Sequence, residues 1–142
     1  MNAQLTGRIR RSLLQTSGLS DSDYEVLVQL SEAPEGRLRS YELVAALQWE
    51  KSRLSHHLRR MEARGLVGRE GCDTDRRGAF VVLTPEGRVS IEDAAPDHVE
   101  EVRRSFLDAL TPAQIDALAG ISHAVIERLD DLAATESDQL NG

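Results

Sequence analysis

Apolar residues recur at intervals of three and four along most of the chain, and polar residues separate them. This spacing places apolar side chains on one face of a helix, so the sequence predicts a mostly helical protein. The first helix is expected over residues 4–15. Ser20 and Asp23 have the spacing of a capping box, so a second helix is expected to begin there and to end near Ala33.

Two short helices follow, separated by a tight turn at residues 48–49. The first is expected to have Ser40 as its N-cap and to run to about Leu47. The second covers residues 50–64, and Gly65 is placed to stop it in a left-handed conformation. One face of this second helix is apolar and the opposite face is polar or basic. The apolar face holds Leu54, Leu58 and Met61, and the opposite face holds Ser52, His56 and Arg59.

The chain changes character after this helix. Residues 66–70 and 79–83 have strand propensity, and the charged segment between them has turn composition. Together they predict a β-hairpin with a charged tip. Residues 37–39, before the two short helices, form a further extended piece.

The remaining sequence returns to helical spacing. Residues 84–85 are a threonine cap followed by proline, and they open a long helix in which Pro96 is expected to produce a kink. Residues 111–112 repeat this signal for the last helix. The apolar seam of that helix consists of Ile115, Leu118, Val125, Leu129 and Leu132, with Ser122 in the remaining position. Such a seam packs against other helices, and residues 136–142 are expected to form a flexible tail.

The composition agrees with one mainly α domain, spanning residues 1–142, with a small β-hairpin. Only 4% of the residues are aromatic, and 40% are hydrophobic. No apolar run is long enough to cross a bilayer and no signal-peptide pattern is present, so we expect a cytoplasmic protein without a membrane partner. No nucleophile, base and orienting residue form a known motif, and no phosphate loop occurs, so we expect neither catalytic residues nor a cofactor.

Net charge argues against nucleic acid until it is divided along the chain. The formal charge is −7 over 142 residues. The segment from Arg37 to Ala79, however, contains ten Lys or Arg residues and six carboxylates. It therefore carries a charge of +4, and the remainder of the chain carries −11. Affinity for nucleic acid depends on local neutralisation of phosphates, because repulsion from distant carboxylates is screened over about 10 Å at 0.1 M salt. The basic segment therefore marks a candidate DNA-binding region.

This basic segment also has the outline of a winged helix-turn-helix, over residues 20–83. The second short helix would contact bases and phosphates in the major groove, through Lys51, Ser52, Arg53, Ser55, His56 and Arg59. The hairpin would form the wing and send Arg76 or Arg77 toward the adjacent minor groove. Double-stranded DNA is therefore the expected partner.

The run from Leu43 to Arg88, LVAALQWEKSRLSHHLRRMEARGLVGREGCDTDRRGAFVVLTPEGR, resembles the MarR family of bacterial transcriptional regulators. The wing carries that family's Asp-x-Arg-Gly pattern as Asp75, Arg77 and Gly78. The resemblance implies a homodimer that binds a pseudo-palindromic operator, usually as a repressor, and is released by a small anionic or phenolic ligand or by oxidation. It also implies that Asp75 holds the wing arginine, Arg77, and that helices in residues 1–17 and 84–135 serve for dimerisation.

One feature departs from the family pattern. The first helix expected here is shorter than is usual, which predicts either a reduced dimer interface or a chain that starts late. The sequence does not identify a ligand site, although a family-type effector pocket is expected where the winged helix meets the dimerisation helices. Trp49 and Tyr24 are interpreted as packing residues rather than ligand-stacking groups.

Other functions remain as alternatives. A winged-helix adaptor would bind a protein through the acidic helices, although the basic helix face argues against it. A metal site at His56 and His57 is not expected, because adjacent residues on a helix point about 100° apart. A redox switch at Cys72 is a further alternative, since its basic neighbours favour a thiolate. Against it, Asp73 and Asp75 oppose that effect, and no second cysteine is present to resolve an oxidised thiol.

Overall fold

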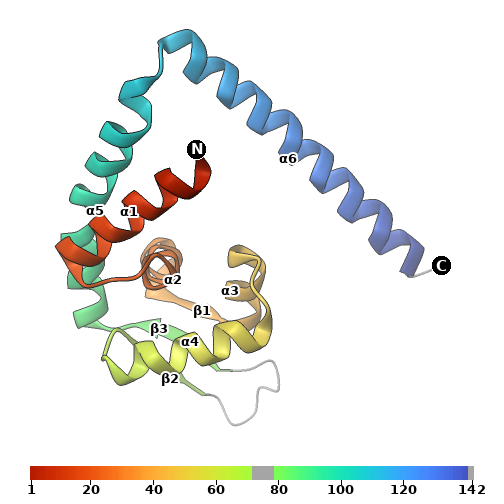
Figure 1. Ribbon diagram of the computed structural model, residues 1–142. Helices are drawn as coiled ribbons and strands as arrows, with labels where there is room; N and C mark the ends of the chain where they lie inside the picture. Colours follow the sequence, from red (N-terminus) through yellow and green to blue (C-terminus); the bar gives the residue numbers. More distant parts are fainter. Residues whose placement is uncertain (72–78, 141–142) are drawn as a thin grey trace. The chain divides into compact units, whose positions relative to one another are not determined.

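The computed structural model describes residues 1–71 and 79–140, and the side chains of 138–140 are not among those described. The chain forms two compact units, Met1–Glu101 and Val102–Gly142. In chain order the first unit holds α1 (Asn2–Ser17), α2 (Asp21–Glu32), the 3-10 helix η1 (Pro34–Gly36), β1 (Arg37–Arg39), α3 (Ser40–Leu47), α4 (Lys51–Ala63), β2 (Val67–Glu70), β3 (Phe80–Leu83) and most of α5 (Pro85–Ser105) (Figure 1). The second unit holds the end of α5, the 3-10 helix η2 (Leu107–Ala109) and α6 (Pro112–Leu140).

The three strands form one antiparallel sheet in the order β1-β3-β2. The predicted hairpin is confirmed, since Val67 pairs with Leu83 and Glu70 pairs with Phe80. The extended piece at 37–39 becomes the third strand, with Arg39 opposite Phe80. Burial alternates along β3, and Val81 is fully buried. The sheet thus turns one face to the helices of this unit.

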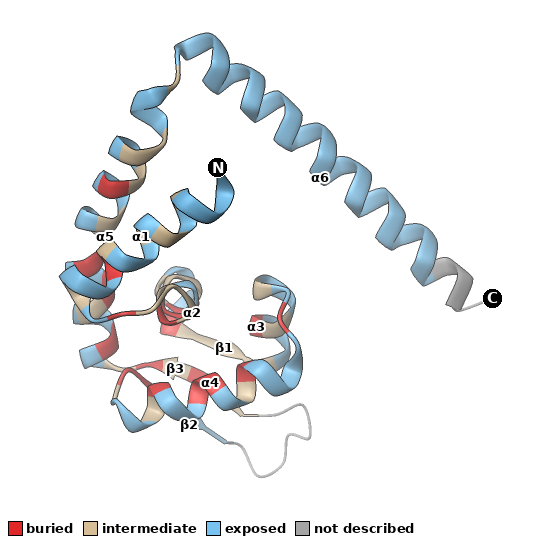
Figure 2. Cartoon of the chain, in the orientation of Figure 1, coloured by how far each residue is buried: buried red, intermediate tan, exposed pale blue. Residues whose placement is uncertain are grey.

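The core of the first unit is built around α2. Val26, Leu27 and Leu30 of this helix have no exposed surface, and α2 contacts α1, α3, α4, β1 and β3. Figure 2 shows the buried positions of this unit gathered on the inward faces of its helices and on the sheet. The predicted apolar stripe of α4 joins this core, since Leu54, Leu58 and Met61 are each at most 2% exposed. Burial of these side chains supplies the main stabilising free energy of the unit.

Local signals set most helix ends. The capping box of α2 is confirmed: the Asp23 amide donates to Ser20 Oγ at 3.0 Å, and the Ser20 amide donates to Asp23 Oδ2 at 2.9 Å. Ser40 was expected to be the N-cap of α3, which is wrong, because Ser40 is the first helical residue. The Arg39 amide donates to Glu42 Oε2 at 2.7 Å, so Arg39 is the N-cap.

Two glycines are required by the backbone: one follows the end of α4, and the other lies where α5 packs close to the residue before β2. Gly65 adopts a φ of +75°, the left-handed conformation predicted for it. A Cβ at Gly87 would lie 2.0 Å from the Leu66 carbonyl oxygen, so only glycine fits this position. Thr84 Oγ1 accepts from the Gly87 amide at 2.9 Å and donates to the Gly65 carbonyl at 2.6 Å. The first turn of α5 is therefore held against the backbone at the start of β2.

Within the second unit, α6 begins at a capping box. The Thr111 amide donates to Gln114 Oε1 at 2.9 Å, and the Gln114 amide donates to Thr111 Oγ1 at 3.2 Å. The helix continues to Leu140, so it includes residues 136–140 of the segment expected as a tail. Its apolar residues remain exposed in the single chain, with Val125 at 53% and Leu129 at 58%.

Candidate nucleic-acid interface

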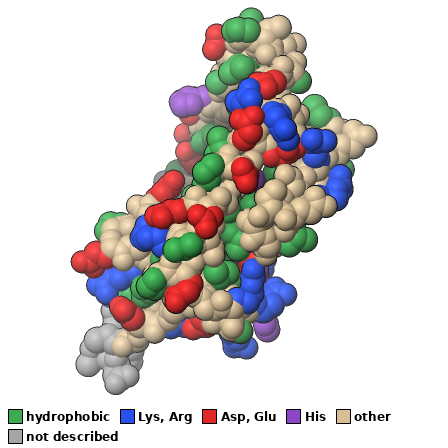
Figure 3. Space-filling view, turned by 90° about the vertical axis from the view of Figure 1, so that its left-hand side faces the viewer, with side chains coloured by type: hydrophobic (Ala, Val, Ile, Leu, Met, Phe, Trp, Pro, Cys, Tyr) green, Lys and Arg blue, Asp and Glu red, His purple; other side chains and the backbone are tan. Residues whose placement is uncertain are grey.

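Helix α4 carries all six residues predicted for DNA contact by the recognition helix. Five of them are exposed, and Ser55 is half-buried. Because the apolar stripe of the same helix is buried in the core, these side chains are held on the outward face. The exposed residues of the set are Lys51, Ser52, Arg53, His56 and Arg59. Figure 3 shows, for the face that it draws, acidic and basic side chains interspersed on the surface.

Arg53 is held by two neighbours rather than free in solvent. Its guanidinium carbon lies 3.9 Å from the centroid of the Trp49 ring, a cation–π geometry. Its Nη2 donates to Ser22 Oγ, at the start of α2, at 3.3 Å. Trp49 itself is 7% exposed, which confirms its interpretation as a packing residue. Sequence spacing places Arg53 on the outer face but gives no sign of these contacts.

A buried carboxylate connects the start of α2 with α4. Asp23 is 2% exposed, and its Oδ2 accepts from Arg64 Nη1 at 2.6 Å in addition to the Ser20 amide. Its Oδ1 lies 2.9 Å from His57 Nε2. Arg64 also donates from Nη2 to the Gly18 carbonyl at 3.1 Å. The sequence spacing predicts Asp23 only as a capping residue and gives no sign of its contacts with Arg64 and His57.

Asp23 is ionised near pH 7. Burial alone would raise the pKa of this carboxyl. The hydrogen bonds from Arg64 and from the Ser20 amide, with the charges of Arg64 and His57, outweigh burial, so the pKa of Asp23 lies below its ordinary value of 3.8. The residue therefore acts as a fixed negative charge between α2 and α4.

Arginine residues also cover the sheet beside the predicted wing. The guanidinium carbons of Arg37 and Arg39 lie 4.5 Å and 4.3 Å from the centroid of the Phe80 ring. Arg37 Nη1 also donates to Glu70 Oε2 at 3.1 Å. The predicted DNA-binding residues of the wing, Asp75, Arg76 and Arg77, lie outside the described residues, as does Cys72.

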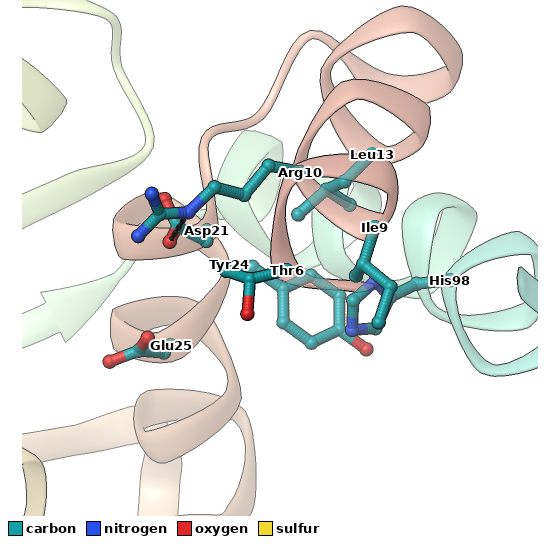
Figure 4. A pocket seen from close by; sticks show the side chains of 8 residues that line it. All are labelled: Thr6, Ile9, Arg10, Leu13, Asp21, Tyr24, Glu25 and His98. Carbon is teal, nitrogen blue, oxygen red and sulfur yellow. Dashed lines mark hydrogen bonds and ion pairs between the residues drawn. The ribbon is translucent and has the colours of Figure 1, made fainter. Parts of the chain in front are cut away.

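A cavity of about 250 Å³ lies between α1, α2 and α5, within the first unit (Figure 4). The Tyr24 and His98 rings meet there with centroids 4.2 Å apart, and Arg10 Nε donates to Asp21 Oδ2 at 2.6 Å. Burial lowers the pKa of His98, and burial together with the charge of Glu32 raises the pKa of Tyr24, so both rings are neutral near pH 7. The lining residues are Thr6, Ile9, Arg10, Leu13, Asp21, Tyr24, Glu25 and His98.

Neither a metal site nor a membrane span is found among the residues that the structure describes. No three His, Cys, Asp or Glu side chains in residues 1–71 and 79–137 come together as metal ligands. Within the same part of the chain, no helix has both the length and the apolar character to cross a membrane.

Comparison with known proteins places this fold in one family. The family model described as "MarR family" matches residues 17–78. The Escherichia coli O111:H- transcriptional regulator HosA is 36% identical over 85 residues, which are 58% of this chain and 62% of HosA. The match thus spans less than two thirds of that curated relative.

Two solved structures from Streptomyces coelicolor cover more of the chain. The MarR family transcriptional regulator AbsC is 43% identical, with a TM-score of 0.83 over 91% of this chain and 86% of AbsC. The MarR family transcriptional regulator Sco3205, solved in complex with DNA, is 40% identical, with a TM-score of 0.83 over 90% of this chain and 83% of Sco3205. The helix-turn-helix, the three-stranded sheet and these similarities agree, and the chain belongs to the MarR family of winged helix-turn-helix transcriptional regulators.

Proposed function

We propose that this protein is a homodimeric repressor that binds a pseudo-palindromic operator with α4 in the major groove. The observation that carries the proposal is the division of α4 into a buried apolar stripe and an exposed polar and basic face. Ser52 and His56 are short enough to approach base edges, and Lys51 and Arg59 reach bases or phosphates. The solved complex of the similar Sco3205 with DNA supports this assignment.

The wing supplies the second contact of the proposal. Glu70 and Phe80 pair at the ends of β2 and β3, and residues 71–79 join the two strands in the sequence. That segment carries Arg76 and Arg77, and Asp75 is the proposed partner that orients Arg77. An arginine in a narrow minor groove adds affinity and sensitivity to groove shape.

A second copy of the chain is the proposed cover for α6. Its predicted seam is exposed along its length, with Ile115 and Leu118 at 38% and 39% and Leu132 at 42%. Ile121 and Ile126 add further exposed apolar surface. A self-complementary helical surface of this kind typically pairs two subunits about a two-fold axis, which matches the symmetry of a palindromic operator.

Release by a small ligand is the proposed means of regulation. The cavity between α1, α2 and α5 has a volume of about 250 Å³, which is below the usual range of ligand pockets, so the proposed ligand is a small one. Its charged lining consists of Arg10, Asp21 and Glu25, and Arg10 is already paired with Asp21. An anion would therefore have to compete with Asp21 for Arg10.

Selection of bound sequences from a random DNA pool tests the proposal. We expect enrichment of a palindrome whose half-sites are separated by about one helical turn. Affinity for the selected duplex should fall steeply with salt, because several phosphates are neutralised. A protein that enriches no sequence and binds no DNA at low salt would instead be the winged-helix adaptor.

Two substitutions localise the interface on the chain. Arg59→Ala removes a basic side chain from the exposed face of α4 and is expected to weaken operator binding about 10-fold or more. Arg11→Ala removes the same charge from an exposed position on α1 and controls for net charge. Equal losses for the two variants would contradict the assignment of α4 as the recognition helix.

A further inference from the structure

Three residues of α4 and its C-cap lie in one row on the helix surface, and all three contact the first turn of α2. Arg53 donates to Ser22, His57 lies beside Asp23, and Arg64, the C-cap of α4, donates to Asp23. We call these five residues the α2–α4 polar cluster. Their positions on α4 are i, i+4 and i+11, which fall within an arc of about 40° and span about 16 Å of helix. The start of α2 therefore contacts the recognition helix near its beginning, middle and end.

The cluster does more than a helix start requires. A capping box is complete with the Ser20 side chain and one carboxylate oxygen, and it works at an exposed position. Here the capping acid is almost fully buried, and its two oxygens lie against two different side chains of α4. Burying a charge is costly unless it is paired, so this arrangement is maintained by its contacts with α4.

The contacts fix how α4 is rotated about its own axis. The apolar stripe next to the cluster, with Leu54 and Leu58, holds α4 against the core, but apolar contacts have no preferred direction. Hydrogen bonds, such as those that Arg64 donates to Asp23 and Arg53 donates to Ser22, do have a preferred direction and a narrow range of lengths. A rotation of 20° would shift side chains at the surface of α4 by about 2 Å, more than a base contact tolerates.

We propose that Asp23 is a positioning residue for DNA recognition, which sets the rotation of α4 through Arg64 and His57 while Ser22 fixes Arg53 at the start of the helix. This inference rests on the proposed function, because it concerns how well the protein distinguishes its operator from other DNA. Asp23 itself is buried and touches no DNA. It acts by setting the positions of the exposed side chains of α4.

The test compares Asp23→Asn with Glu32→Gln. Asparagine retains an oxygen that can accept from the Ser20 amide, but it removes the charge that Arg64 and His57 contact. Glu32→Gln makes the same carboxylate-to-amide change at an exposed position on the same helix. Affinity is measured for a duplex selected by the wild-type protein and for a scrambled duplex of equal length, at a temperature where circular dichroism shows each variant to be folded.

Asp23→Asn is expected to lower the ratio of the two affinities about 10-fold or more, mainly by weakening the selected duplex, because contacts with several bases are displaced together. Glu32→Gln is expected to leave this ratio within about 2-fold of the wild type. A folded Asp23→Asn variant that keeps the wild-type ratio overturns the proposal.

Arg64 provides a second route if Asp23→Asn does not fold. Its side chain is 44% exposed, so Arg64→Gln leaves a smaller defect in the core. The variant is expected to lower the same affinity ratio without changing the salt dependence for the scrambled duplex, whereas loss of a phosphate contact would reduce that slope by about 1. A reduced slope with an unchanged ratio overturns the proposal, because Arg64 would then contact DNA directly.

Conservative and double variants complete the test. Arg64→Lys keeps the positive charge beside Asp23 and is expected to restore part of the ratio lost in Arg64→Gln. In the double variant, Asp23→Asn with Arg64→Gln, the ratio is expected to fall by less than the sum of the two single losses, because both changes break the contact between Asp23 and Arg64. Additive losses overturn the proposal. If the wild-type protein does not distinguish the two duplexes, the proposed function itself fails, and this inference fails with it.

Discussion

Helices α4 and α6 both have one apolar side, but this side is buried in α4 and exposed in α6. In α4 the apolar side chains are buried within the chain, and Met61 has no exposed surface. In α6 the corresponding side chains are exposed, and Ile121 reaches 63%. This contrast shows which side of each helix is available for function. For α4 it is the polar face, which is proposed to contact DNA, and for α6 it is the apolar face, which is proposed to pack against a second copy of the chain.

The largest expected effect comes from truncating a buried leucine of α4. Leu58→Ala should lower the free energy of unfolding by about 2–5 kcal/mol, because it leaves a cavity in the core. Leu129→Ala, in the exposed seam of α6, should have an effect that depends on protein concentration. Urea unfolding at two concentrations measures both. A concentration-independent loss of the same size for Leu129→Ala would remove the contrast between the helices.

Charges placed in the seam of α6 should separate the subunits. The double variant Val125→Asp with Leu129→Asp buries carboxylates in the proposed interface, so we expect a shift from dimer to monomer in sedimentation velocity. Operator affinity should fall, because one half-site is then bound without the other. Helical content by circular dichroism should remain. A wild-type protein that sediments as a monomer would contradict the assignment of α6 as an interface.

Arg77→Ala should change neither the stability that α4 provides nor the association proposed for α6. We expect it to weaken operator binding by about 1–3 kcal/mol while the thermal midpoint and the sedimentation coefficient stay unchanged, because a wing arginine contributes to DNA binding alone. Fluorescence anisotropy with the selected duplex measures the loss. Unchanged operator affinity would exclude Arg77 from the interface.

The smallest effect is the pH dependence of the contact between α2 and α4. The pKa of Asp23 in the folded protein lies below 3.8, so its stabilising contribution is present above that value and is lost as the pH falls through the folded pKa. Asp23→Asn should therefore lower the free energy of unfolding by about 1–3 kcal/mol at pH 7. The difference from the wild type should shrink below about pH 4, as urea unfolding at several pH values will show. A difference that is constant with pH would mean that the charge of Asp23 does not stabilise the fold.

Local signals account for what the sequence predicts well. The periodicity of α4, the capping pair of α2 and the stop at Gly65 depend on residues a few positions apart, and the structure confirms them. The same periodicity predicted which side of α4 is exposed, and five of the six candidate residues are exposed in the structure. Residue identity along a short window is sufficient for such features.

Contacts between distant residues account for what the sequence misses. The pairing of β1 with β3 joins segments more than forty positions apart, and Asp23 meets Arg64 across a separation of 41 residues. No local pattern distinguishes an aspartate that only caps a helix from one that also holds another helix. Ser40 was misplaced within a local pattern: α3 begins one residue earlier than expected, and its N-cap amide, that of Arg39, donates to Glu42.

Gly87 has a consequence for how this protein can vary. A single methyl group there would collide with the carbonyl of Leu66, so the first turn of α5 lies directly against the backbone of the residue that precedes β2. Every codon change that replaces this glycine adds at least that methyl group. Random mutagenesis with selection for the proposed operator binding should therefore leave position 87 with one permitted residue, even though no DNA or ligand contact is proposed for it.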